Sequence, residues 1–146
     1  MHLRTYIATH THTLAELHIF FENTSCKFHG DGQDVAYIDV EIADARGERC
    51  PTDYARVDFA ISGPGIWRGG YNSGIVDSTN NLYLYTECGI NRVFVRSTLQ
   101  PGRIAVTASR PGLRSGDLTL ITKPVNLLDG LSTDLPPRLN LNPKEH

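Results

Sequence analysis

Apolar and polar residues alternate along most of this chain. The clearest case is the run at residues 35–43, whose apolar positions are Ala36, Ile38, Val40 and Ile42. A period of two places alternate side chains on opposite faces of a β-strand. We therefore expect a strand with this apolar face toward a core, and with the intervening residues directed outward, namely Tyr37, Asp39 and Glu41.

The same alternation recurs at residues 57–61, where Val57, Phe59 and Ile61 would face inward. We expect further strands at residues 82–86, 90–98, 103–109 and 117–122. Turn residues such as Asp31-Gly32 and Pro101-Gly102 separate the runs, and no run has the period of a helix. Short strands at intervals of about 8–12 residues predict an all-β sandwich of about seven to nine short antiparallel strands.

Two kinds of segment depart from this pattern. Residues 66–74 contain Gly69, Gly70 and Gly74, and we expect a loop there because glycine tolerates backbone shapes that other residues resist. Residues 1–29 would hold strands at 4–8 and 14–21, whose affiliation is open. Residues 124–146 are rich in proline and lack alternation, so we expect a tail or linker. The expected domain therefore covers residues 30–123.

The composition and net charge of the chain limit the classes of partner that it is expected to bind. The chain has 146 residues, 40% of them hydrophobic, and a net charge of −2. A charge so close to zero argues against nucleic acid or a membrane surface as the main partner. No apolar run approaches the length of a membrane span, and the first residues lack the apolar run of a signal peptide.

The cysteines and histidines suggest no cofactor or metal. Cys26, Cys50 and Cys88 are too widely spaced for a metal or redox motif, so three free thiols are favoured over one disulfide with a spare thiol. His10 and His12 would share a strand face, which is a usable metal geometry. A polar strand edge is the favoured interpretation, because no third ligand stands at a convincing spacing.

The carboxylates suggest no catalytic pair. Hydrolysis of a glycosidic bond needs two carboxyl groups flanking that bond. The candidates lie mostly on outward strand positions or in turns, where a solvated charge is the usual state; they are Asp39, Glu41, Asp44, Asp53, Asp58, Asp77 and Glu87. We therefore expect no catalytic residues in this chain.

Several motifs occur in an order that resembles a known family. They are DGQDVAYIDVEIADARGERCPTDYARVDFAISGPG, then IWRGGYNSG, NLYLYTECGINRVFVRST and PGRIAVTASRPGL. This series resembles the C-terminal immunoglobulin-like domain of bacterial family 2 glycoside hydrolases of the β-galactosidase type. The resemblance runs from Asp31 to about Ile121.

The resemblance implies an immunoglobulin-like β-sandwich without activity of its own. In the resembled enzymes the catalytic glutamates lie on a barrel that this chain lacks. The implied role is to brace that upstream catalytic domain, with carbohydrate as a further partner. The alternatives are a free-standing carbohydrate-binding module and a purely structural spacer or interaction domain. The resemblance also implies a periplasmic or extracellular location in a bacterium.

One loop carries the residue types that bind sugars. Aromatic rings stack on the apolar faces of sugars, and polar side chains pair with hydroxyl groups. The candidates for carbohydrate or domain contact are Trp67, Arg68, Tyr71 and Asn72, followed by Tyr83, Tyr85 and Glu87. The favoured alternative is structural, with Trp67 closing one end of the core and Asn72 capping a turn. A docking face for a catalytic domain has a weight similar to that of sugar contact.

Two arginines flank an aromatic residue on the strand expected at residues 90–98. Arg92 and Arg96 would point to the same side as Phe94. Such a pair suits an acidic glycan, but outward arginines more often pair with carboxylates on neighbouring strands.

Overall fold

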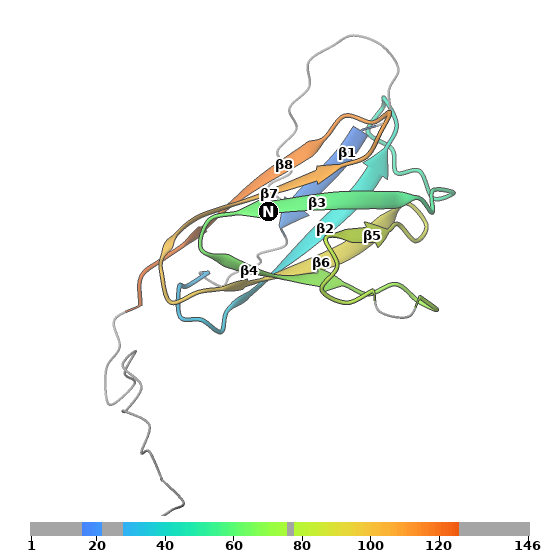
Figure 1. The fold of residues 1–146 in the computed structure, drawn as a ribbon. Helices are drawn as coiled ribbons and strands as arrows, with labels where there is room; N and C mark the ends of the chain where they lie inside the picture. Colours follow the sequence, from blue (N-terminus) through green and yellow to red (C-terminus); the bar gives the residue numbers. More distant parts are fainter. Residues whose placement is uncertain (1–15, 22–27, 76–77, 126–146) are drawn as a thin grey trace, which may run out of the picture.

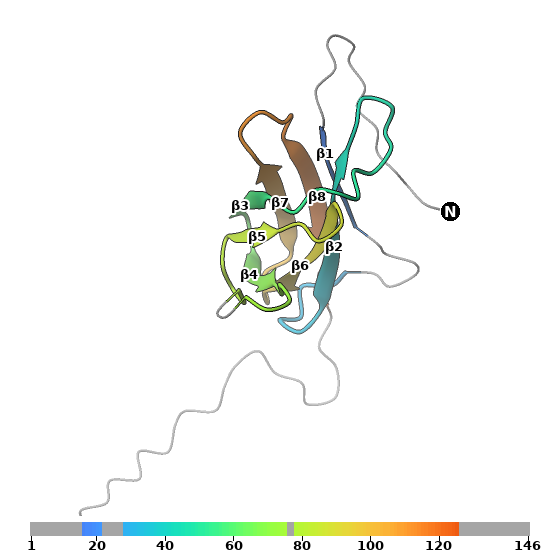
Figure 2. The same ribbon diagram turned by 90° about the vertical axis from the view of Figure 1, so that its right-hand side faces the viewer.

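The computed structural model describes residues 16–21, 28–75 and 78–125, and these residues form strands and connections without a helix. There are eight strands in the described part of the chain: β1 (Glu16–Phe21), β2 (Val35–Ala43), β3 (Arg56–Ser62), β4 (Gly65–Gly70), β5 (Tyr83–Tyr85), β6 (Ile90–Ser97), β7 (Gly102–Ser109) and β8 (Gly116–Thr122). They form two four-stranded antiparallel sheets, ordered β1-β2-β6-β4 and β5-β3-β7-β8. Figures 1 and 2 show the two sheets stacked on each other. The predicted all-β sandwich is confirmed.

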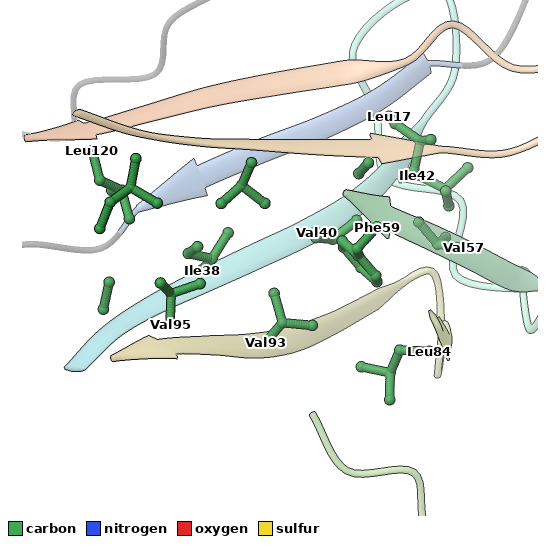
Figure 3. Packing of buried hydrophobic residues seen from close by; sticks show 14 of the residues in the cluster. Leu17, Ile38, Val40, Ile42, Val57, Phe59, Leu84, Val93, Val95 and Leu120 are labelled. Carbon is green, nitrogen blue, oxygen red and sulfur yellow. The ribbon is translucent and has the colours of Figure 1, made fainter. Parts of the chain in front are cut away.

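The core lies between the two sheets and is built from the alternating positions. Ile38 and Val95 of the first sheet and Ile104 and Val106 of the second have no solvent exposure. Figure 3 shows side chains from both sheets pointing into this shared interior. Burial of apolar area at about 25 cal/mol per Å² is the main stabilising contribution to such a sandwich.

Strand β1 belongs to the first sheet. It pairs with β2 along its whole length, with Leu17 opposite Ile42 and Phe21 opposite Ile38. The Leu17 side chain is buried in the core, and its backbone N–H donates to the carbonyl oxygen of Arg114 at 3.1 Å. The strand therefore helps to close the side of the sandwich where β1 approaches β8.

Strand β4 corrects the loop expected at residues 66–74. Gly65 to Gly70 pair with β6, and a bulge between Trp67 and Gly69 shifts the register. A Cβ atom on Gly70 would overlap the carbonyl oxygen of Arg92, so this glycine permits close approach of two strands. The glycines that suggested a loop from sequence instead allow a bulged edge strand.

Several predictions fall outside the described residues. These are the strand at residues 4–8, His10, His12, Cys26, Asp77 and the tail from residue 126. Cys50 and Cys88 are free thiols in the structure. A membrane-crossing helix is absent from the part of the chain that the structure describes.

Candidate functional site

The candidate residues gather where the chain leaves β4 and returns through β5 to β6. A two-residue turn, Cys88-Gly89, joins Glu87 to Ile90 through reciprocal backbone hydrogen bonds of 2.9 and 3.3 Å. Both turn residues have positive φ, 55° and 77°, as a type I′ hairpin turn requires. This turn carries the chain from the second sheet to the first and fixes Glu87 beside β5.

Asn72 binds the loop after β4 to strand β5. Its side chain is 2% exposed, and its amide oxygen accepts the Tyr85 backbone N–H at 2.9 Å. Its amide nitrogen donates to the Tyr85 carbonyl oxygen at 2.7 Å and to Glu87 Oε1 at 3.0 Å. Because the side chain meets Tyr85 as a neighbouring strand would, Asn72 replaces a strand partner at the edge of β5.

We expect Asn72→Ala to lower the free energy of unfolding by roughly 1–3 kcal/mol, because it removes the acceptor of the Tyr85 N–H in a buried place. Denaturant titration measures the loss. Ser73→Ala is the matched control, since Glu87 accepts from the backbone N–H of Ser73 at 2.8 Å and that group remains. Equal stability of the two variants would contradict this role for Asn72.

Glu87 is held by the same loop. Hydrogen bonds from the Asn72 side chain, and then from the Ser73 backbone N–H, hold the pKa of Glu87 below its ordinary value of 4.5. A carboxyl group whose pKa is lower in the folded state stabilises the fold when it is ionised. The stabilisation is complete above the ordinary pKa and is lost as pH falls through the folded-state value.

The stability difference between wild type and Glu87→Gln should therefore depend on pH. We expect the wild type to be the more stable near neutral pH, and this advantage to shrink as the pH falls below 4.5. Thermal unfolding of both proteins across this range measures it. A difference that does not change with pH would contradict the assigned hydrogen bonds.

The Trp67 side chain is partly buried and packs against the hydrophobic core of the sandwich. Its ring lies 5.1 Å from the ring of Phe59, measured between centroids, and its Nε1–H donates to the carbonyl oxygen of Asn81 at 2.8 Å. Both the apolar and the polar part of the indole thus have partners within the domain. This arrangement is the structural alternative that the sequence favoured.

The remaining candidates lie at the surface. Tyr71 is 67% exposed and Arg68 is exposed on the β4 bulge. Tyr83 and Tyr85 pack edge to face, with centroids 6.5 Å apart, and the guanidinium of Arg56 lies 3.9 Å from the centroid of the Tyr83 ring. The structure therefore divides the candidates into an inward group, Trp67, Asn72 and Glu87, and an outward group, Arg68, Tyr71, Tyr83 and Tyr85.

Arg56 and Asp58 adjoin the outward tyrosines, and sequence analysis did not include them in the site. The register of β3 and β5 places Arg56 opposite Tyr85 and Asp58 opposite Tyr83. Alternation showed that these residues point outward, but only the pairing of β3 with β5 shows which tyrosines lie beside them.

Most of the candidate carboxylates are bound to partners within the fold. Asp39 is 5% exposed and makes a two-pronged ion pair with Arg92, with distances of 2.6 and 2.7 Å. Asp53 pairs with Arg110 at 2.7 Å, and Asp58 with Arg56. Asp44 accepts two backbone N–H groups of its own turn. Within residues 16–21, 28–75 and 78–125 no three metal-binding side chains come together.

Comparison with known proteins identifies similar domains. The model of glycoside hydrolase family 2 C-terminal domain 5 matches residues 21–119. A β-glucuronidase of Formosa agariphila is 57% identical over 106 residues, which cover 73% of this chain and 11% of that protein. A β-galactosidase of Bacteroides ovatus is 28% identical over 95 residues, covering 62% of this chain and 11% of that protein.

Solved structures agree with these matches. A β-glucuronidase from glycoside hydrolase family 2 superposes with a TM-score of 0.77 and 48% identity, over 86% of this chain and 13% of that one. A family 2 member from Bacteroides cellulosilyticus gives 0.68 and 28%, over 75% of this chain and 14% of that one. The chain thus spans only about an eighth of the length of these similar proteins.

Proposed function

This chain belongs to the glycoside hydrolase family 2 C-terminal domain 5 family, and we propose that it is an accessory domain that braces a larger family 2 glycosidase. The observation that carries the proposal is the asymmetry of coverage: 73% of this chain matches only 11% of a β-glucuronidase. The match is to a C-terminal domain and not to a catalytic barrel, so the chain is not catalytic by itself.

The parent enzyme that we propose is of the β-glucuronidase type. The β-glucuronidase of Formosa agariphila shares 57% identity with this chain, against 28% for the β-galactosidase of Bacteroides ovatus. The solved structure with a TM-score of 0.77 is also of a β-glucuronidase. The β-galactosidase type that the motifs suggested becomes the alternative specificity.

The hydrogen bonds and packing contacts of the candidate residues around the loop after β4 support the bracing function. Asn72 and Glu87 are engaged in hydrogen bonds within the domain, and the Trp67 ring packs on Phe59. A loop held in this way gives a rigid surface, which suits a permanent contact between domains.

Carbohydrate contact is a second candidate function, and the exposed tyrosines favour it. Tyr71, Tyr83 and Tyr85 present rings outside the core, with Arg68 nearby on the chain. Flat rings beside polar groups suit the faces and hydroxyls of sugars. Titration of the chain with glucuronides and galactosides tests it: heat of binding that Tyr71→Ala or Tyr85→Ala abolishes would support this function, and absence of heat would reject it.

The bracing function is tested in the Formosa agariphila β-glucuronidase. One variant lacks the segment that matches this chain, and a chimera carries this chain in that place. We expect the deletion to lower the melting temperature and the turnover of a nitrophenyl glucuronide, and the chimera to restore both. The isolated chain should release no nitrophenol. A deletion that leaves stability and turnover unchanged would reject the bracing function.

A further inference from the structure

The outer face of the first sheet carries a group of partly exposed residues, four of them aliphatic or aromatic and one an arginine. We name this group the outer patch; its residues are Val35, Tyr37, Ile66, Phe94 and Arg96. Their exposed fractions include 38% for Val35, 49% for Tyr37 and 36% for Ile66. The strand register makes them neighbours, because Arg96 lies opposite Val35 on one side and Ile66 on the other, while Tyr37 lies opposite Phe94.

Two aromatic rings form the middle of the outer patch. The rings of Tyr37 and Phe94 meet edge to face, at 88° and with centroids 5.4 Å apart. Such a pair holds both rings in place, so they lose little freedom when a partner covers them. Exposed rings of fixed position are typical of the centre of a protein interface.

The Arg96 side chain has an unsatisfied hydrogen-bond donor among the described residues. Its Nε atom is buried and has no hydrogen-bond acceptor among the residues that the structure describes. Burying a charged donor without an acceptor is costly, and a carboxylate matches a guanidinium with two parallel hydrogen bonds. Arg92, two outward positions away on β6, shows the satisfied case, because Asp39 binds it in this manner.

On the outer face of the second sheet, by contrast, polar side chains pair with each other. On this face Thr107 Oγ1 donates to Asp117 at 2.6 Å, and Arg56 binds Asp58. These paired groups have less to gain from a partner protein than the buried Nε of Arg96, which has no acceptor among the described residues.

The described strands around the outer patch do not offer Arg96 a free carboxylate from a second copy of this chain. In a two-fold contact the outer patch would meet itself. The outward carboxylates of strands β2, β4 and β6 are Asp39, already paired with Arg92, and Glu41, which lies toward the other end of β2 from Val35 and opposite Ile90. Neither of these carboxylates is placed to bind Arg96 of a second copy, which favours a different protein surface as the source.

We propose that the outer patch is the docking surface of this domain on the rest of its family 2 polypeptide. The surface that it meets would be apolar and would offer one carboxylate to Arg96. This inference rests on the bracing function proposed above. It is supported by the size of the proteins that contain such a domain, since this chain matches only 11–13% of the β-glucuronidases, and by the aromatic and arginine composition typical of interface centres.

The first test is side-chain oxidation by hydroxyl radicals, measured by mass spectrometry on the isolated chain and on the chimera. Tyr37 should be oxidised several-fold more slowly in the chimera, while Tyr71 and Tyr85 should be oxidised at the same rate in both. If Tyr71 and Tyr85 are protected and Tyr37 is not, the docking surface is wrong but bracing survives. If no tyrosine is protected and the deletion has no effect, bracing itself is wrong.

The second test separates docking from a structural role of Arg96. Arg96→Leu should lower the melting temperature of the chimera and leave that of the isolated chain unlowered, because the buried Nε has no acceptor in the part of the chain that the structure describes. Arg103→Leu is the control, an exposed arginine on β7 of the second sheet, and should behave alike in both proteins. An equal loss from Arg96→Leu in both proteins would overturn the docking role. So would protection of Tyr37 that rises with the concentration of the isolated chain, since this would indicate self-association.

Discussion

Phe59→Ala should lower the free energy of unfolding by roughly 3–5 kcal/mol, the range for removing a buried aromatic ring and leaving a cavity. Phe59 is 7% exposed and packs against Trp67 between the two sheets. Its backbone continues β3, pairing with Ala108 of β7, so little can move to fill the space. Denaturant unfolding monitored by tryptophan fluorescence measures the loss, and the signal comes from the ring that Phe59 contacts.

Tyr71→Ala is the matched control for this measurement. The Tyr71 side chain is 67% exposed, so its removal should change the free energy of unfolding by less than about 1 kcal/mol. If Phe59→Ala has an effect as small as this, the inward face assigned to β3 is wrong.

Gly89→Ala should lower the free energy of unfolding by roughly 2–5 kcal/mol, because two penalties act together. Gly89 has a φ of 77°, where a residue with a Cβ atom is strained by roughly 1–2 kcal/mol. A Cβ atom at this position would also overlap the backbone carbonyl oxygen of Cys50, and relieving that overlap adds roughly 1–3 kcal/mol. The turn also positions Glu87, so the loop after β4 should loosen as well.

Gly47→Ala separates the two penalties. Gly47 has a φ of 78°, but a Cβ atom there would meet no atom within 4 Å. We expect a loss of only about 1–2 kcal/mol, the cost of the left-handed conformation alone. Equal losses for Gly47→Ala and Gly89→Ala in thermal or denaturant unfolding would show that the contact with Cys50 is unimportant.

The inward and outward faces of the strands follow from the sequence alone. Ala36, Ile38, Val40 and Val57 were assigned to the core by alternation, and each is at most 1% exposed. This success has a simple cause: a period of two in a strand separates the two faces whatever strand lies alongside. The sandwich class followed because many such strands in a short chain must cover one another.

Strand β4 and the division of the candidate site were decided by the tertiary structure. Judged from the neighbouring sequence alone, Gly69 and Gly70 indicate a loop. Only their pairing with β6 makes them part of a strand. Likewise, the amide of Asn72 is suited equally to a sugar or to a backbone until the pairing brings Tyr85 beside it.

The sequence by itself thus determined which side chains share a face, because that depends on the geometry of one strand. Only the tertiary structure decided which partners each face meets: Arg92 has Asp39, whereas the Nε of Arg96, on the same side of the same strand, has no acceptor within the described ranges. The physical reason is that hydrogen bonds and ion pairs depend on distances between segments far apart in the chain, and the order and register of strands set those distances.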